Sequence, residues 1–198
     1  LDFFTLALQD GGIGDVRGDV VVRGDLSVNA IATAPSQYAV SLLGGAEIDA
    51  DTNFSNSGAV VIGDAATDDS FFRGGLGFDG NPTSLNLAGT IRTDSTALDL
   101  VAATLDADTT LVSGSAAITG TSITDAGPGF TLTLREDAAT ATGAVTFTDA
   151  VDVDALETFA QGYDVRLLGD GTRVATAVAF ENTGVVSLGD GGDTLTFE

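Results

Sequence analysis

Two glycine-rich turns of the sequence carry the residues best suited to chemistry, because each combines carboxylates with exposed backbone carbonyls. One runs from Gly63 to Asp69 and the other from Gly189 to Asp193. Oxygen atoms of these kinds are the ligands of a hard cation such as calcium, which takes about six to eight of them. We therefore predict calcium at these turns, with the candidate ligands Asp64, Asp68, Asp69, Asp190 and Asp193. Solvated Asp-Gly corners without a metal are the other interpretation of the same residues.

A second kind of chemistry needs two carboxylates close to an arginine. Asp152 and Asp154 lie two positions apart, so on a strand their side chains share one face. With Arg166 they could form the site of a β-helical polysaccharide lyase or hydrolase, which uses paired carboxylates. We favour an exposed, soluble acidic face, because nothing in the sequence brings the three together. We expect no enzymatic activity and keep the polysaccharide-active enzyme as a remote alternative.

The composition excludes most other chemistry. The 198 residues contain no cysteine, histidine or lysine. Thiolate and imidazole catalysis, zinc or haem ligation by these groups and disulfides are therefore excluded. A formal net charge of −22 argues against nucleic acid, since affinity for phosphates comes largely from Lys and Arg. No apolar run approaches the roughly 20 residues of a membrane-spanning helix, so we expect no membrane span.

Two Arg-Gly-Asp tripeptides occur, at residues 17–19 and 23–25. Exposed on a protruding loop, such a sequence could engage integrins. Here each tripeptide adjoins a valine-rich stretch, and Val16-Arg-Gly-Asp-Val20 is typical of a strand followed by a corner. We therefore interpret them as structural elements of a repeating β-fold.

An internal repeat determines how all of these residues are positioned. The segments Tyr38-Ala-Val-Ser-Leu-Leu-Gly44 and Tyr163-Asp-Val-Arg-Leu-Leu-Gly169 begin 125 positions apart. Flanking segments match in the same order at offsets of 125 or 126. We conclude that residues 4–72 and 130–197 are two copies of one unit, that 73–129 is the intervening segment, and that 1–198 is a single continuous β-repeat domain.

The local pattern is that of short β-strands. Apolar residues alternate with small polar ones in several segments: 4–8, 19–22, 85–91, 130–134 and 193–197. Glycine and aspartate interrupt these runs and supply the tight corners between them. The stretch 153–160 also permits a helix, because Val153, Leu156 and Ala160 would share one helical face.

Short strands, small inward residues and frequent corners together predict an all-β fold, a right-handed β-solenoid with coils of roughly 18–21 residues. A period of about 126 residues would then hold about six or seven coils. The alternative fold is a set of β-sandwich modules joined by strand exchange, in which a terminal strand completes a neighbour's open edge.

The segments 184–197 and 85–91 resemble the β-strand repeats of very large bacterial exoproteins, the filamentous-haemagglutinin-like adhesins. The resemblance is one of composition and rhythm, and it implies a secreted β-helical surface protein. We accordingly expect a non-enzymatic structural or adhesive protein, extracellular or at the cell surface, that forms a rigid stalk or a filament.

The expected partners are copies or neighbouring repeats of the same protein, and cell-surface glycan or matrix. A calcium-dependent filament subunit that polymerises by donor-strand exchange is the alternative function. The sequence begins with Leu1 and no signal-like segment precedes it, so we expect a processed product or a piece of a longer protein.

Overall fold

A computed structural model describes residues 5–8, 18–127, 129–136 and 142–198. These residues form an all-β solenoid of about 8 turns, with roughly 21 residues per coil. The predicted solenoid is confirmed, and the chain does not form the alternative stack of β-sandwiches. The stretch that permitted a helix consists of two strands, β18 (Val151–Val153) and β19 (Ala155–Thr158). No helix capable of crossing a membrane occurs in the part of the chain that the structure describes.

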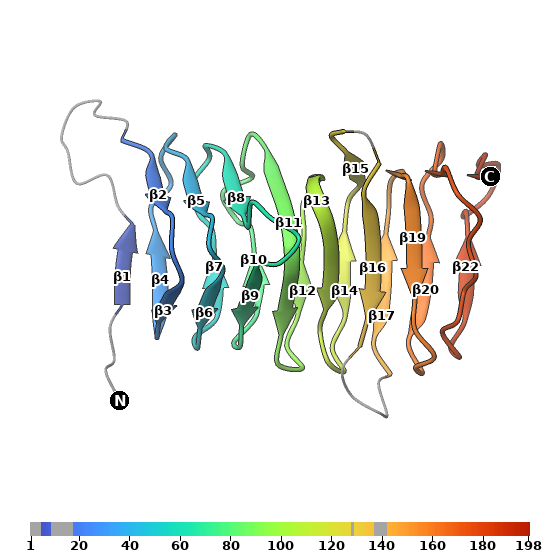
Figure 1. The fold of residues 1–198 in the computed structure, drawn as a ribbon, viewed down its shortest axis with the longest axis horizontal. Helices are drawn as coiled ribbons and strands as arrows, with labels where there is room; N and C mark the ends of the chain where they lie inside the picture. Colours follow the sequence, from blue (N-terminus) through green and yellow to red (C-terminus); the bar gives the residue numbers. More distant parts are fainter. Residues whose placement is uncertain (1–4, 9–17, 128, 137–141) are drawn as a thin grey trace.

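Each coil has three strand faces, and the coils follow one another along the long axis of the molecule (Figure 1). The first face holds β2 (Val20–Val22), β5 (Val40–Leu42), β8 (Val60–Ile62), the first part of β11 (Leu85–Thr93), the first part of β13 (Ala103–Val112), β15 (Ile123–Asp125), β18, β21 (Arg173–Val174) and β23 (Thr196–Phe197).

The second face is continuous with the first, because the long strands β11 and β13 run across both. Its other strands are β3 (Leu26–Val28), β6 (Ala46–Ile48), β9 (Asp69–Phe72), β16 (Thr131–Arg135) and β19. The third face begins with a two-stranded sheet of β1 (Thr5–Leu8) and β4 (Ala30–Thr33). It continues as a seven-stranded ladder made of β7 (Thr52–Asn53), β10 (Leu76–Gly77), β12 (Leu98–Asp99), β14 (Ile118–Gly120), β17 (Ala144–Phe147), β20 (Asp164–Leu167) and β22 (Val186–Leu188).

All of the strand pairs are parallel and join one coil to the next. On the first face, Val20 pairs with Val40 and Val40 with Val60, so each step there takes 20 residues. The widest step on this face, from Ile123 to Val151, takes 28 residues. Corners therefore absorb insertions of several residues while the strands stay in register.

The core is a single column of side chains enclosed by the three faces. Alternate residues point inward, and Val40, Leu42, Val60 and Ile62 are all fully buried. The outward positions between them carry mostly small or polar residues. This is the period-two pattern expected from the sequence, since successive side chains of a strand point to opposite faces.

The two sequence copies have the same register but occupy different faces. In the first copy Val20, Val40 and Val60 stack on the first face. Their sequence equivalents Val145, Val165 and Val186 stack in the same order, but on the third face. From β2 to its equivalent β17, the chain first makes five complete coils, which end at β15 on the first face. It then continues through β16 on the second face to β17 on the third face, which adds two-thirds of a coil. One repeat is therefore five and two-thirds coils, fewer than the six or seven predicted.

A buried tyrosine marks the corner between two faces once in each copy. The hydroxyl of Tyr38 accepts a hydrogen bond from the amide of Ala34 at 2.8 Å, and that of Tyr163 accepts one from Phe159 at 2.9 Å. One coil later, an asparagine side chain donates to the tyrosine carbonyl at 3.1 Å in both copies, from Asn56 and from Asn182. We call these two sites the tyrosine–asparagine corners.

A glycine beside each of these corners lets the neighbouring coil approach. A Cβ at Gly58 would lie 2.2 Å from the carbonyl oxygen of Tyr38, and one at Gly184 would lie 2.2 Å from that of Tyr163. No side chain fits at such a distance. Each copy of the repeat thus contains the same corner, made of a tyrosine, an asparagine and a glycine from two adjacent coils.

Candidate functional site

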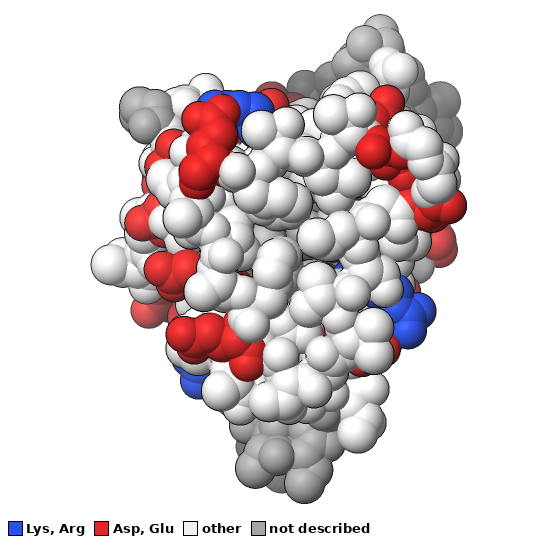
Figure 2. All heavy atoms as spheres, turned by 90° about the vertical axis from the view of Figure 1, so that its right-hand side faces the viewer, with Lys and Arg blue, Asp and Glu red and all other residues white. Residues whose placement is uncertain are grey.

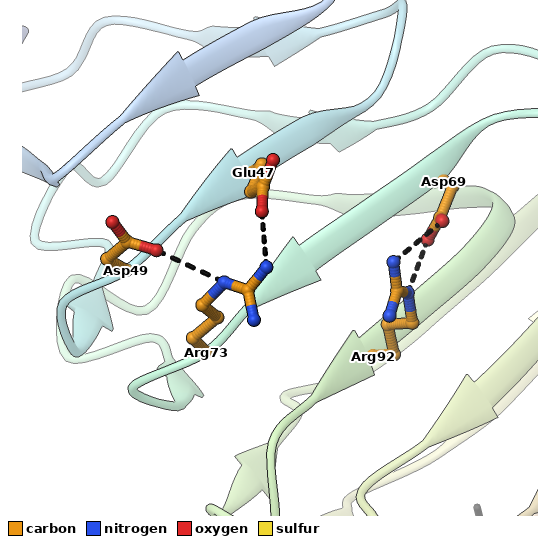
Figure 3. A network of polar contacts seen from close by, with 5 residues as sticks. All are labelled: Glu47, Asp49, Asp69, Arg73 and Arg92. Carbon is orange, nitrogen blue, oxygen red and sulfur yellow. Dashed lines mark hydrogen bonds and ion pairs between the residues drawn. The ribbon is translucent and has the colours of Figure 1, made fainter. Parts of the chain in front are cut away.

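A group of charged side chains lies together on the second face, across β6, β9 and β11 (Figure 3). Glu47, Phe71 and Arg92 are outward residues in direct register on these three strands. The guanidinium carbon of Arg92 lies 3.9 Å from the centroid of the Phe71 ring, and that of Arg73 lies 4.2 Å from it. We call Phe71, Arg73 and Arg92 with their acidic partners the arginine–phenylalanine cluster.

Both arginines of the cluster are held by carboxylates. Arg92 makes a two-point contact with Asp69, through Nε at 2.8 Å and Nη2 at 2.9 Å. Arg73 lies between two acids: its Nη2 donates to Glu47, and its Nε lies 3.1 Å from Asp49 (Figure 3). The pKa of the Arg73 guanidinium is raised, chiefly by the hydrogen bond with Glu47. Both arginines are therefore held by carboxylates over the Phe71 ring.

A shallow groove of about 250 Å³ adjoins the cluster, lined by Asp69, Phe71 and Arg92 together with residues of the two preceding coils. The charged residues that line the groove are Arg92 and three carboxylates, those of Asp25, Glu47 and Asp69, so the groove does not present a surplus of positive charge. Guanidinium and carboxylate groups beside an aromatic ring suit hydrogen bonding to hydroxyl groups and stacking against an apolar ring face.

Two of the five candidate calcium ligands, Asp68 and Asp193, use their carboxylates to close their own turns. One carboxylate oxygen of Asp68 accepts hydrogen bonds from the amides of Asp64 at 2.8 Å and Ala65 at 2.9 Å. In the second copy, one oxygen of Asp193 accepts from the amide of Asp190 at 2.7 Å. These bonds close the turns between β8 and β9 and between β22 and β23, which are equivalent in the repeat.

Asp64 and Asp190 enter these bonds through their backbone amides, and Asp69 faces Arg92 instead of its neighbours in the turn. Within residues 5–8, 18–127, 129–136 and 142–198, no group of three or more acidic side chains is arranged to hold a metal ion. The two turns lie on different corners of the solenoid, so they do not complete one another. Calcium at these turns stays a prediction.

The two aspartates considered for carbohydrate cleavage lie together, but without the expected arginine. Asp152 and Asp154 line a groove of about 270 Å³ with Asp125 and Arg173. Arg166 is on the third face and lies 3.0 Å from Asp164. Arg173 takes its place beside Asp152, at 3.6 Å.

In the same groove, both oxygens of Asp125 accept hydrogen bonds from backbone amides, those of Gly127 and Phe130, each at 2.9 Å. Asp125 therefore closes a turn, as Asp68 and Asp193 do.

The second Arg-Gly-Asp tripeptide, residues 23–25, forms the exposed corner between β2 and β3, as interpreted from the sequence. The first tripeptide begins at Arg17, which lies outside the described residues. Its aspartate, Asp19, accepts a hydrogen bond from the amide of Ala39 on the next coil at 3.0 Å. This acid thus joins two coils.

Sequence reasoning did not find the arginine–phenylalanine cluster. Phe71 and Arg73 are two apart, which places them on one strand face, and Arg92 follows one coil later. Aligning the sequence at intervals of about one coil length would have brought the three together. No protein-family model, curated protein or solved structure matches the chain.

Proposed function

We propose that this protein is a non-enzymatic structural or adhesive component of a cell surface or extracellular matrix, and that its solenoid is a rigid stalk or filament segment. The observation that carries the proposal is the single core column, which the parallel ladders of the three faces enclose along the solenoid. In such a fold each coil binds its neighbours, so stability and stiffness grow with the number of coils.

The mechanical role follows from the direction of the hydrogen bonds. Backbone bonds between coils run along the solenoid axis, so tension along the axis loads many of them together. The outward aspartates and the net charge of −22 keep such a rod from aggregating sideways. The resemblance of the strand repeats to filamentous-haemagglutinin-like adhesins supports the same location, outside the cell.

Adhesion would use the arginine–phenylalanine cluster. Its fixed guanidinium groups and partly exposed Phe71 ring offer the hydrogen bonds and apolar surface that a glycan requires. We expect Phe71→Ser and Arg92→Gln to abolish binding to glycan-coated beads while leaving the melting temperature within a few degrees of the original.

Stretching single molecules between handles at residues 18 and 198 tests the mechanical role. The expected result is a stepwise extension, in which coils are released one after another at a reproducible force. Extension without steps would contradict the rigid stalk. Release of oligosaccharides from acidic polysaccharides by the purified protein would overturn the non-enzymatic part of the proposal.

A calcium-dependent filament subunit is the second candidate, favoured by the two equivalent acidic turns. A ligand that binds only the folded protein raises its apparent stability. Calcium should therefore raise the melting temperature and EGTA should reverse the change, with Asp64→Asn and Asp190→Asn reducing the response. An unchanged midpoint would reject calcium as a structural ligand.

A further inference from the structure

The arginine–phenylalanine cluster is one end of a longer row of outward side chains on the second face. Strand register places the members of this row side by side, one on each of five successive coils: Phe71, Arg92, Val112, Arg135 and Phe159. Phe159 is the first residue after β19 and continues the register of β19 with β16. We call these five residues the axial row. It lies between β6 and the segment 175–181, so each of its coils has a described coil on either side.

The axial row contains two arginine–phenylalanine pairs in opposite order. The guanidinium carbon of Arg92 lies 3.9 Å from the ring centroid of Phe71, one coil before it. The guanidinium carbon of Arg135 lies 5.6 Å from the ring centroid of Phe159, one coil after it. Phe159 is 39% exposed, whereas Val112 in the middle of the row is 3% exposed. The accessible aromatic and cationic groups are therefore concentrated in one pair at each end of the row.

A row of threonines runs beside the axial row, two positions earlier on each strand. Thr90, Thr110 and Thr133 pair in direct register on β11, β13 and β16, and all three are partly exposed. Asp69 on β9 and Glu157 on β19 continue this row at its two ends. Within the part of the chain that the structure describes, none of the three threonine hydroxyls makes a hydrogen bond. The threonine row thus presents one available hydroxyl group on each of three successive coils.

The spacing of both rows suits a linear polymer of sugar rings. Neighbouring parallel strands lie about 4.8 Å apart, so the four steps from Phe71 to Phe159 span about 19 Å. One such step is close to the length of one pyranose residue in an extended chain. A chain of about five sugar residues that lies parallel to the solenoid axis would therefore place successive hydroxyl groups over successive threonines. The apolar faces of its terminal rings would lie against the two phenylalanines.

The charges around the rows favour an uncharged chain. Asp69 holds Arg92 by a two-point contact, and Glu47 and Asp49 hold Arg73. The net charge is −22, and carboxylates lie along both sides of the solenoid in the view along its axis (Figure 2). A chain of uronic acids or sulfated sugars would meet this negative charge along its length. Neutral hydroxyl groups can still accept hydrogen bonds from guanidinium groups and donate them to carboxylates.

We propose that the second face binds an extended, uncharged, linear polysaccharide parallel to the solenoid axis, with the axial row and the threonine row as its binding surface. This inference rests on the adhesive role proposed above and names the class of glycan and its direction on the rod. The two arginine–phenylalanine pairs hold the chain at two points, and the threonines bind the sugar residues between them. A short oligosaccharide reaches only one pair, so affinity depends on chain length.

Calorimetric titration of the full chain with neutral oligosaccharides of defined length tests the proposal. The probes are β-1,4-linked oligomers of glucose and of N-acetylglucosamine, from the monosaccharide to the hexasaccharide. A pentasaccharide reaches both arginine–phenylalanine pairs and a disaccharide reaches one. In at least one of the two series, the pentasaccharide should therefore bind at least about tenfold more tightly than the disaccharide, and the hexasaccharide should gain little more.

Phe159→Ser is the variant that separates the axial row from the cluster around Phe71. It removes the aromatic ring of the distant pair, so the pentasaccharide should bind hardly more tightly than the disaccharide. Binding of the disaccharide should change little, because the pair of Phe71 and Arg92 remains. Val21→Ser is the matched control, since Val21 is an outward apolar residue of the first face and is 45% exposed. This control should bind every probe as the original protein does.

Thr110→Val tests the threonine row. Valine keeps the β-branched shape that suits a strand and removes the central hydroxyl group. The change should weaken binding of the pentasaccharide, by less than Phe159→Ser does, and leave the melting temperature almost unchanged. If Phe159→Ser melts early, Phe159→Leu replaces it, because leucine keeps an apolar side chain and lacks the aromatic ring.

The outcomes distinguish failure of the axial binding surface from failure of the adhesive role. Binding that requires Phe71 but does not strengthen with chain length would overturn the axial surface and leave the proposed adhesive cluster in place. An unchanged affinity of the Phe159 variant for the pentasaccharide would do the same. Tighter binding of oligogalacturonates than of neutral chains of equal length would overturn the uncharged class. No binding at any length in either neutral series would contradict both the axial surface and the adhesive role.

Discussion

The two copies of the repeat differ less in their sequence than in what lies next to them. In the first copy, the next strand on the face of Val60 and Ile62 is β11, which pairs with β8 and buries both residues completely. Residues 145–188 of the second copy have the same register, yet Leu188 at their end is 46% exposed. In a solenoid, the burial of a residue is thus determined by the neighbouring coil as much as by its own strand.

The copies also differ in which position of one ion pair carries the positive charge. Glu47 and Arg73 face each other on β6 and at the end of β9 in the first copy. At the equivalent positions of the second copy the charges are exchanged, with Arg173 on β21 lying 3.5 Å from Glu198. The repeat therefore preserves a pair of opposite charges between two coils, whichever coil carries the cation.

The largest expected difference between the copies lies in their cores. Replacing Ile62 by Ala should lower the free energy of unfolding by about 2–5 kcal/mol, because it leaves a cavity beneath β11. Replacing its equivalent Leu188 by Ala should lower it by less than about 1 kcal/mol in dilute, monomeric protein, as at other exposed sites. Urea unfolding measures both values. Equal losses would show that the final coil is as enclosed as the third.

The tyrosine–asparagine corners should respond alike in the two copies. Tyr163→Phe removes the acceptor for the Phe159 amide and the donor to the Leu134 carbonyl, which lies at 2.6 Å. Tyr38→Phe likewise leaves the Ala34 amide without the tyrosine oxygen. Each change should lower the free energy of unfolding by about 1–3 kcal/mol, the usual effect of leaving a buried polar group unpaired. A neutral effect in one copy alone would show that the two corners are not equivalent.

Alkaline pH gives a smaller test that is specific to the second copy. Burial raises the pKa of the Tyr163 phenol above its ordinary value of 10.0. In the unfolded chain this phenol loses its proton first, so its contribution to stability is complete below pH 10 and is lost as the pH rises through the raised value. The melting temperature should fall above about pH 10, and Tyr163→Phe should reduce that fall. If the variant and the original protein lose stability identically as the pH rises, ionisation of Tyr163 is not the cause.

Exchanging the charges of the first-copy ion pair should have the smallest effect. Arg73→Glu alone should lower the stability of the protein only slightly, since the pair is well exposed and screened by solvent. Adding Glu47→Arg recreates the order found in the second copy and should restore most of the loss. The double-mutant cycle is measured by urea unfolding at low salt. A double variant no more stable than the two single changes predict would show that the pair does not interact.

Much of the fold follows from local sequence pattern. Alternation at Val40 to Leu42 and at Val165 to Leu167 predicts strands with one buried face, and the matching tyrosines align the copies. The number of coils per repeat could not be predicted, because it depends on corner length. The step from Ile123 to Val151 takes 28 residues, and no rule of strand periodicity gives that number.

The candidate sites were less predictable than the fold. Asp68 and Asp193 were interpreted as metal ligands because carboxylates in glycine-rich turns serve both purposes, binding cations or closing the turn through backbone amides. The direction of the side chain decides between them, and sequence does not show it. The arginine–phenylalanine cluster required the pairing of β9 with β11, a contact between residues about one coil apart.

The fractional number of coils in one repeat has a consequence for any longer array of the same unit. Each copy is turned by one face relative to the last, so a side chain that recurs in every copy would point in three directions in succession. A flat surface lying against such an array would meet the same residue only at every third copy. A network that encloses the array would contact that residue from every side. Multivalent contact with a plane would thus be sparse, and contact with an enclosing network would be dense.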